Sequence, residues 1–298
     1  MKYLKLKLTI LFVALLSSGL FAQGFYISAN TGYAFNMNAQ QGWFSDSHRE
    51  TIHNYFTGDY SSTTTYKEIK FGLGKGLNFG GSVGYMFNDY LGLDLGFSYL
   101  LGAETKVKDS YHSQDIYQDH TEDYYSVSNN KLYSRMFTIT PSILITPNFQ
   151  KINPYLKMGV VLGVGSIYWE AVSERSSTGQ VTPTSSTSEY ASKFNGGVAI
   201  GVNASVGVDY NISDKLSVFG ELNLTGMTYN PKKMENTKST VDGVDQLPNM
   251  TTRDKETDFV KKHTETNQPV NEDEPKQQSL LSFPFSSAGV NFGVKFNL

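Results

Sequence analysis

The sequence predicts an all-β protein, a transmembrane antiparallel up-and-down β-barrel of eight strands with long extracellular loops. Apolar residues alternate with small or polar ones over eight stretches of the chain. In a strand this pattern gives one apolar and one polar face. Long polar segments and short turns join the stretches alternately, as in bacterial transmembrane barrels. No segment beyond the N-terminal one is apolar enough for a membrane helix, and only helices or closed barrels can span a bilayer.

The first 22 residues are expected to be a secretory signal peptide, which leaves 23–298 as the barrel. Three lysines lie among the first seven residues, and a mostly apolar run follows to Leu16. Ala22 offers a small residue at the expected cleavage point. A membrane anchor is the alternative, but the apolar run is shorter than the roughly 18–20 residues that a helical span needs.

The first four predicted strands follow in order. Stretch 24–35 alternates aromatic and aliphatic residues with Ser, Asn and Gly, and a long polar segment separates it from 77–87. The turn Asn88-Asp89-Tyr90 joins 77–87 to 91–101, because Asn and Asp tolerate turn conformations. These two stretches are therefore predicted to form a hairpin. Stretch 132–145 is the fourth strand, although it contains a proline on its apolar face.

The remaining four strands repeat this arrangement. Stretch 154–165 places Leu, Met and Val opposite Lys and Gly, and 198–210 does the same with Val and Ile opposite Gly, Asn, Ser and Asp. A short turn leads to 216–226. The longest polar segment then precedes the last strand, 284–298. An even number of strands puts the N-terminus of the cleaved chain and its C-terminus on the same side of the membrane.

Four charged residues fall on the polar, lumen-facing side of these strands: Asp94, Lys157, Glu221 and Lys295. A lysine on the lipid side at mid-bilayer would cost about 2–4 kcal/mol, so an inward orientation is favoured. The lumen of an eight-stranded barrel is just wide enough for side chains. We expect a Glu221–Lys295 pair between neighbouring strands and an Asp94–Lys157 pair across the lumen. Four separate residues in lumen water remain the alternative.

The C-terminal strand carries a family resemblance. Asn291-x-Gly293-x-x-Phe296-x-Leu298 resembles the carboxy-terminal assembly signal of bacterial outer-membrane β-barrels, with Leu298 where the family usually has Phe. The alternating strands resemble the small eight-stranded barrels typified by the transmembrane domain of outer-membrane protein A. The Asn-, Gly- and Tyr-rich composition is similar to that of Bacteroidetes proteins. The resemblance implies a place in the cell outer membrane, with its lipids and the barrel assembly machinery as partners.

No catalytic, cofactor-binding or metal site is predicted, and we do not expect an enzyme. The chain has no cysteine, and its histidines all fall in predicted loops: His48, His53, His112, His120 and His263. In the segment from His48 to His53 the glutamate is misplaced for a helical zinc motif. A net charge of −3 argues against nucleic acid as a partner.

The sequence therefore predicts a structural or surface-interaction protein that displays long extracellular loops. An extracellular ligand that binds these loops is a further candidate partner. The alternative is a narrow channel or lateral gate for small or hydrophobic molecules.

Overall fold

The computed structural model describes residues 24–37, 45–69, 71–147, 149–179, 183–263 and 269–298. The predicted signal peptide lies outside these residues. The described chain is almost entirely β-structure, with one short 3-10 helix at Leu247–Asn249 and one four-residue helix, α2, at Thr252–Lys255.

Among the residues that the structure describes, no helix is both long and apolar enough to cross a membrane.

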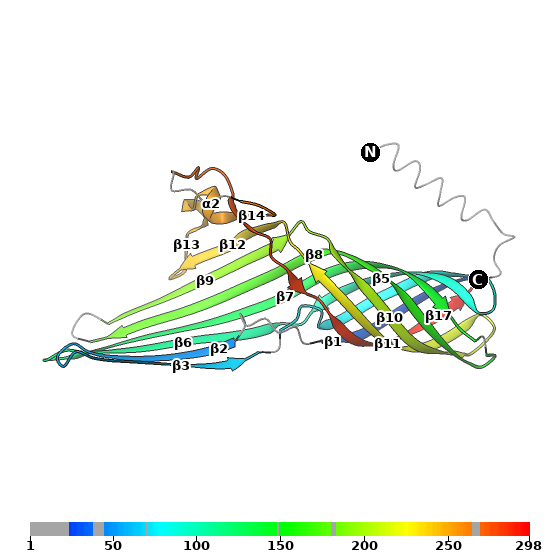
Figure 1. The fold of residues 1–298 in the computed structure, drawn as a ribbon, viewed down its shortest axis with the longest axis horizontal. Coiled ribbons are helices and arrows are strands. Elements are labelled where there is room, and N and C mark those ends of the chain that lie inside the picture. The colour runs from blue at the N-terminus through cyan, green and yellow to red at the C-terminus, as the bar shows by residue number, and fades with distance from the viewer. Residues whose placement is uncertain (1–23, 38–44, 70, 148, 180–182, 264–268) are drawn as a thin grey trace.

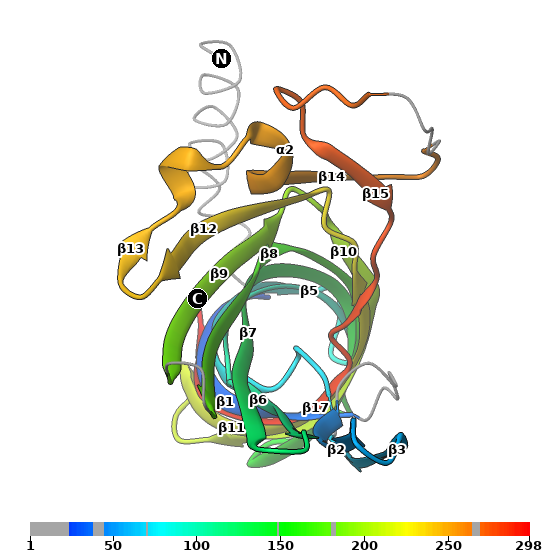
Figure 2. The ribbon, with the colours of Figure 1, turned by 90° about the vertical axis from the view of Figure 1, so that its left-hand side faces the viewer.

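Eight of the strands form a continuous ring of antiparallel ladders. They are β1 Phe25–Asn36, β4 Gly76–Met86, β5 Leu91–Gly102, β7 Thr121–Ile145, β8 Ile152–Thr178, β10 Ala199–Asn211, β11 Leu216–Tyr229 and β17 Ser287–Asn297. Each pairs with the next in this order, and β17 pairs back with β1. Figure 2 shows the ring from one end. The ladders return to their starting strand, so the ring has no open edge.

The segments predicted as long loops contain further strands, so the expected count of eight is too low. The sheet has 17 strands in the described part of the chain. The additional strands are β2 Ser45–Asn54, β3 Asp59–Glu68, β6 Thr105–Ile116, β9 Thr184–Asn195, β12 Lys233–Val241, β13 Val244–Asp245, β14 Glu256–Val260, β15 Lys276–Ser279 and β16 Phe283–Pro284.

Most of these strands build an extension beyond the ring. β7 and β8 run on past the ring as a paired ribbon, and β6 and β9 pair with its two sides. β2 and β3 continue the sheet from β6, while β12, β14 and β15 continue it from β9. The Ser/Thr-rich segments become strands because β7 and β8 supply edges with which their backbones can pair.

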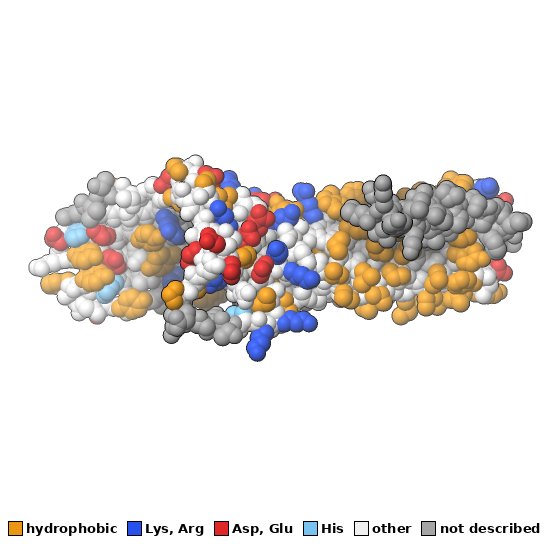
Figure 3. Space-filling view, turned by 90° about the horizontal axis from the view of Figure 1, so that it is seen from above, with side chains coloured by type: hydrophobic (Ala, Val, Ile, Leu, Met, Phe, Trp, Pro, Cys, Tyr) orange, Lys and Arg blue, Asp and Glu red, His pale blue; other side chains and the backbone are white. Residues whose placement is uncertain are grey.

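The ring and the extension differ in surface chemistry. Apolar side chains point outward from the ring: Leu93 is 50% exposed, Val202 64% and Phe292 65%. Figure 3 shows apolar side chains over the ring, and a mixture of polar, charged and apolar side chains over the extension. The short turns β4–β5, β7–β8 and β10–β11 and the C-terminus lie at the end far from the extension (Figure 1).

Candidate functional site

The carboxylate of Asp94 is the first anchor of a polar network inside the ring. It is buried, and it accepts hydrogen bonds from Tyr26 Oη at 2.6 Å and from Ser82 Oγ at 2.7 Å. The Nζ of Lys157 lies 3.5 Å from Asp94 Oδ1. These side chains come from β1, β4, β5 and β8 and meet inside the ring, because alternate residues of every strand point inward.

Lys157 also binds a second carboxylate. Its Nζ lies 3.6 Å from Glu221 Oε2, so the lysine bridges Asp94 and Glu221. Tyr155 Oη donates to Glu221 at 3.0 Å, and Asn291 Nδ2 donates to it at 3.4 Å. Three of the four charged residues singled out in the sequence therefore belong to one chain of contacts.

The fourth, Lys295, has a different partner from the one expected. It pairs with Asp209 of β10, and both side chains are mostly buried. The expected Glu221–Lys295 pair is wrong because of the strand register: Glu221 stands opposite Asn291, whereas Lys295 stands opposite Ser217. Four residues along a strand separate Lys295 from Asn291 by about 13 Å.

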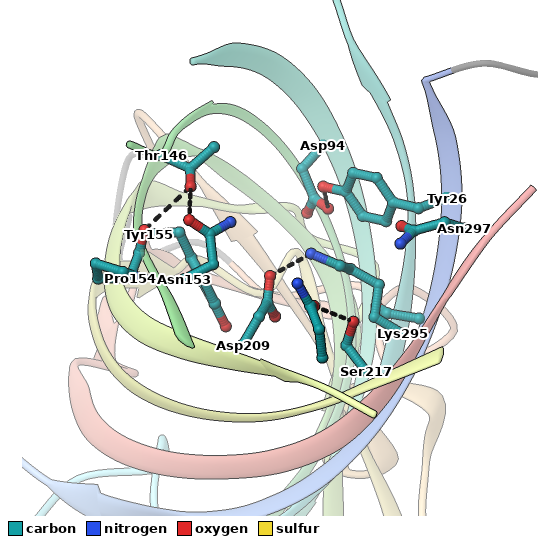
Figure 4. A network of polar contacts seen from close by, with 12 residues as sticks. Tyr26, Asp94, Thr146, Asn153, Pro154, Tyr155, Asp209, Ser217, Lys295 and Asn297 are labelled. Carbon is teal, nitrogen blue, oxygen red and sulfur yellow. Dashed lines mark hydrogen bonds and ion pairs between the residues drawn. The ribbon is translucent and has the colours of Figure 1, made fainter. Parts of the chain in front are cut away.

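Asp209 is the functional residue that the sequence reasoning did not single out. The alternation of β10 already placed it on the polar face, so parity could have identified it. Figure 4 shows Asp209 and Lys295 joined inside the ring, near Tyr26 and Asp94. With Asp209 included, three carboxylates face two ammonium groups, and each charge is held by an oppositely charged partner. Such pairing is what permits charges to remain in a site with little water.

Two tyrosine side chains each pass over a glycine of the intervening strand and reach a carboxylate on the strand beyond it. On adjacent strands Tyr26 stands opposite Gly84, and Gly84 stands opposite Asp94. A Cβ at Gly84 would lie 2.0 Å from Tyr26 Cζ, so the ring occupies the space that a side chain would take.

The same arrangement recurs on the far side of the ring. Tyr155 stands opposite Gly207, which stands opposite Glu221, and a Cβ at Gly207 would lie 2.3 Å from Tyr155 Cζ. In both places glycine is required by close packing.

Two packed layers lie across the lumen, one on each side of a cavity of about 140 Å³. Toward the extension, buried apolar side chains meet: Leu100, Met136, Val161, Met227 and Phe285 belong to this apolar layer and also line the cavity. Figure 2 shows the chain just before β4 passing inside the ring, and Phe71 and Leu73 of this segment belong to the same buried apolar cluster.

Toward the short turns, the second layer consists of the charge network and a small buried cluster made of Tyr26, Leu144, Tyr155 and Phe219. The cavity between the two layers is lined mainly by Asn, Ser and Thr side chains.

The residues of the C-terminal signal lie on the strand that closes the ring. Besides Asn291, which contacts Glu221, a Cβ at Gly293 would lie 2.6 Å from Phe219 Cζ, so Gly293 makes room for that ring. Phe296 is 40% exposed on the outer face, and the backbone N–H of Leu298 donates to the carbonyl oxygen of Phe25 at 2.9 Å. Their role in assembly stays a prediction.

The sequence predicts that all the histidines lie in loops, and this prediction is wrong for three of them. His48 and His53 belong to β2 and His112 belongs to β6, all in the extension. His112 Nε2 lies 3.1 Å from Asp123 Oδ1, and His48 Nε2 lies 3.3 Å from Glu50 Oε1. No cluster of three or more His, Asp or Glu side chains suited to a metal ion occurs within the described ranges.

Comparison with known proteins places this fold in a class. Residues 9–245 match the family described as the outer membrane protein beta-barrel domain. The chain belongs to this family, and the protein is located in the outer membrane. A search of curated proteins found no match.

The solved structures that are similar to this chain include the following two. The Neisserial surface protein A (NspA) is 13% identical with a TM-score of 0.30, and the match covers 92% of this chain and 97% of that one. CarO of Acinetobacter baumannii is 14% identical with a TM-score of 0.28, and the match covers 74% of this chain and 92% of that one.

Proposed function

We propose that this protein is a non-conducting structural barrel of the outer membrane that holds a β-sheet contact surface outside the cell. In this proposal the eight-strand ring crosses the membrane, because its outer face is apolar and its edges are all paired. The extension lies on the extracellular side, since short turns are typical of the periplasmic end of such barrels. The barrel acts as an anchor and has no catalytic role.

The observation that carries this proposal is the filling of the lumen at two levels. The apolar layer consists of side chains that are almost completely buried, such as Met136 and Phe285 at 1% exposure. The second layer is held by ion pairs of Lys157 and Lys295. An ion that passed would have to cross an apolar layer and then break a paired network, and both steps are costly.

A narrow channel is the second candidate, and the cavity between the layers favours it. Its volume of about 140 Å³ would hold on the order of ten water molecules at about 10–15 Å³ each. Its polar lining suits water or a small polar solute. Conduction would require both layers to open.

Planar-bilayer recording of the purified full chain separates the two candidates. We expect no conductance steps from the native protein, and none from Phe285→Ala or Lys157→Ser alone, because each substitution weakens one layer and leaves the other unchanged. The double variant should conduct. Conductance steps from the native protein would overturn the structural proposal. A heat-modifiability gel is the control that each variant is folded.

The orientation has its own test, which uses the absence of cysteine. Val244 in the extension is 61% exposed, and Ile212 in the β10–β11 turn is 56% exposed. A membrane-impermeant maleimide should label Val244→Cys on intact cells and Ile212→Cys only after the outer membrane is permeabilised. The opposite result would place the extension in the periplasm.

A further inference from the structure

Strand β3 forms one margin of the extension, and within the described residues only one of its two edges is paired. Among the described residues its backbone forms a single ladder, with β2. Nine of its ten residues are exposed, including Tyr60 at 66% and Tyr66 at 68%. Figure 2 shows β3 at the outer rim, away from the ring. A strand whose second edge is free can pair with another strand through its backbone groups.

The sequence of β3 is nearly symmetric about its centre. Reading outward from Thr63, Ser62 matches Thr64 and Ser61 matches Thr65. Further out, Tyr60 matches Tyr66, and Asp59 matches Lys67 with opposite charge. We propose that β3 pairs antiparallel with β3 of a second copy of this chain, with Thr63 opposite Thr63. This inference rests on the proposed extracellular position of the extension.

Backbone geometry restricts the register to a few choices. In an antiparallel pair, two opposite residues either both point their N–H and C=O groups at the partner or both point them away. Since the two strands are identical, opposite residues must both be even-numbered or both odd-numbered. The register can therefore shift only in steps that keep this parity.

Among the permitted registers, the one centred on Thr63 has complementary side chains. It sets Asp59 opposite Lys67 twice and Tyr60 opposite Tyr66 twice, and opposite charges and aromatic pairs stabilise neighbouring strands. Moving the centre to Ser62 or to Thr64 removes both kinds of pair. Asp59 already accepts a hydrogen bond from Thr57 Oγ1 at 2.6 Å, which leaves its second oxygen for the lysine.

The symmetry also decides where the second copy lies. A two-fold axis between antiparallel strands is perpendicular to them. Because β3 runs along the long axis of the molecule (Figure 1), the two-fold axis lies in the plane of the membrane. The second copy is therefore inverted relative to the first along the membrane normal. The partner is therefore a copy in a facing membrane. One strand pair is a small interface, so many copies must act together to join two membranes.

A charge-swap experiment with two dye-labelled populations of phosphatidylcholine vesicles, each holding the full chain, tests this inference. Native vesicles should bind one another. Lys67→Asp vesicles and Asp59→Lys vesicles should each lose self-binding at least ten-fold, because like charges then face each other twice. Mixed together, the two variants should bind, since every facing pair is again opposite in charge.

Glu68→Lys is the matched control, because it changes the net charge by the same amount as Asp59→Lys. In the proposed register Glu68 faces Gly58, so this variant should keep self-binding and fail to restore binding of Lys67→Asp vesicles. Restoration by Glu68→Lys, or failure of the swapped mixture to bind, would overturn the proposed pairing.

Cysteine substitution in this cysteine-free chain supplies a second readout that also works in detergent. Thr63→Cys should form a disulfide between copies, and Thr64→Cys, which faces Ser62, should form much less. Equal yields would refute the register. Absence of bridging while Val244→Cys is labelled from outside would refute this inference alone, whereas labelling of Val244→Cys only after permeabilisation would refute the proposed function.

Discussion

Lys295 and Asp209 form an ion pair although their strands, β17 and β10, are not neighbours in the ring. Strand β11 lies between them and presents Ser217 and Phe219 at this level. The ammonium group thus passes over an intervening strand and reaches the second strand away. The concave inner face of a closed ring favours such a contact, because inward-facing side chains of different strands converge there.

We expect Asp209→Asn and Lys295→Met each to destabilise the barrel by about 3–5 kcal/mol, because each leaves a buried charge without its partner. The double variant should lose less than the sum of the two, with a coupling free energy of about 1–3 kcal/mol. Urea unfolding of the protein in lipid vesicles measures all three values.

The matched cycle uses Glu221→Gln with Lys295→Met. Since Glu221 is bonded to Lys157 and not to Lys295, these two effects should add to within about 0.5 kcal/mol. A larger coupling here than for Asp209 would contradict the pairing described above.

Parity along each strand was enough to place the lumen charges on one face, but it could not choose their partners. Pairing depends on how far each strand is shifted along its neighbour, and a strict two-residue alternation fits every even shift equally well. The alternation pattern therefore allowed Glu221 and Lys295 to face each other on adjacent strands, whereas the ladder sets Lys295 opposite Ser217.

Strands β2, β3 and β9 of the extension could not be predicted for a different reason. β2, β3 and β9 consist largely of Ser, Thr, Tyr and charged residues, so they lack the apolar alternation that marks a strand. They are strands because their backbones pair with one another and with the long β7–β8 ribbon. Such pairing joins residues far apart in the sequence and overrides local propensity.

The tip of the extension should respond to pH through His120. Its Nδ1 lies 2.7 Å from Asp119 Oδ1, and this hydrogen bond raises the pKa of the imidazole above its usual value of about 6.5. The folded tip thus favours the protonated ring. The stabilisation is complete below the unfolded pKa and is lost as the pH rises through the raised, folded pKa.

NMR titration of the His120 ring measures this shift. Asp119→Asn should bring the pKa back toward the usual value, because it removes the negative charge and leaves only a neutral amide oxygen as acceptor. Asp115→Asn removes the same charge without touching the imidazole and should have a smaller effect. An unchanged His120 pKa in Asp119→Asn would show that the pair does not persist in solution.

A methyl group added at Gly84 or Gly207 should displace the tyrosine ring that lies over that glycine. Gly84→Ala should displace the ring of Tyr26 and break its 2.6 Å bond to the buried carboxylate of Asp94. Overpacking costs about 1–3 kcal/mol, and a lost hydrogen bond to a charged group adds about 1.5–3 kcal/mol. Gly207→Ala should act on Tyr155 in the same way.

Gly96→Ala is the matched control, because this glycine also lies in the ring but a Cβ there would meet nothing closer than Thr140 O at 3.6 Å. We expect its effect on unfolding to stay within about 1 kcal/mol. In a Tyr26→Phe background the hydrogen bond is already absent, so Gly84→Ala should then cost only the overpacking part. If Gly84→Ala and Gly96→Ala unfold at the same urea concentration, the tyrosine ring does not occupy the space above Gly84, and Tyr26 does not anchor Asp94 across it.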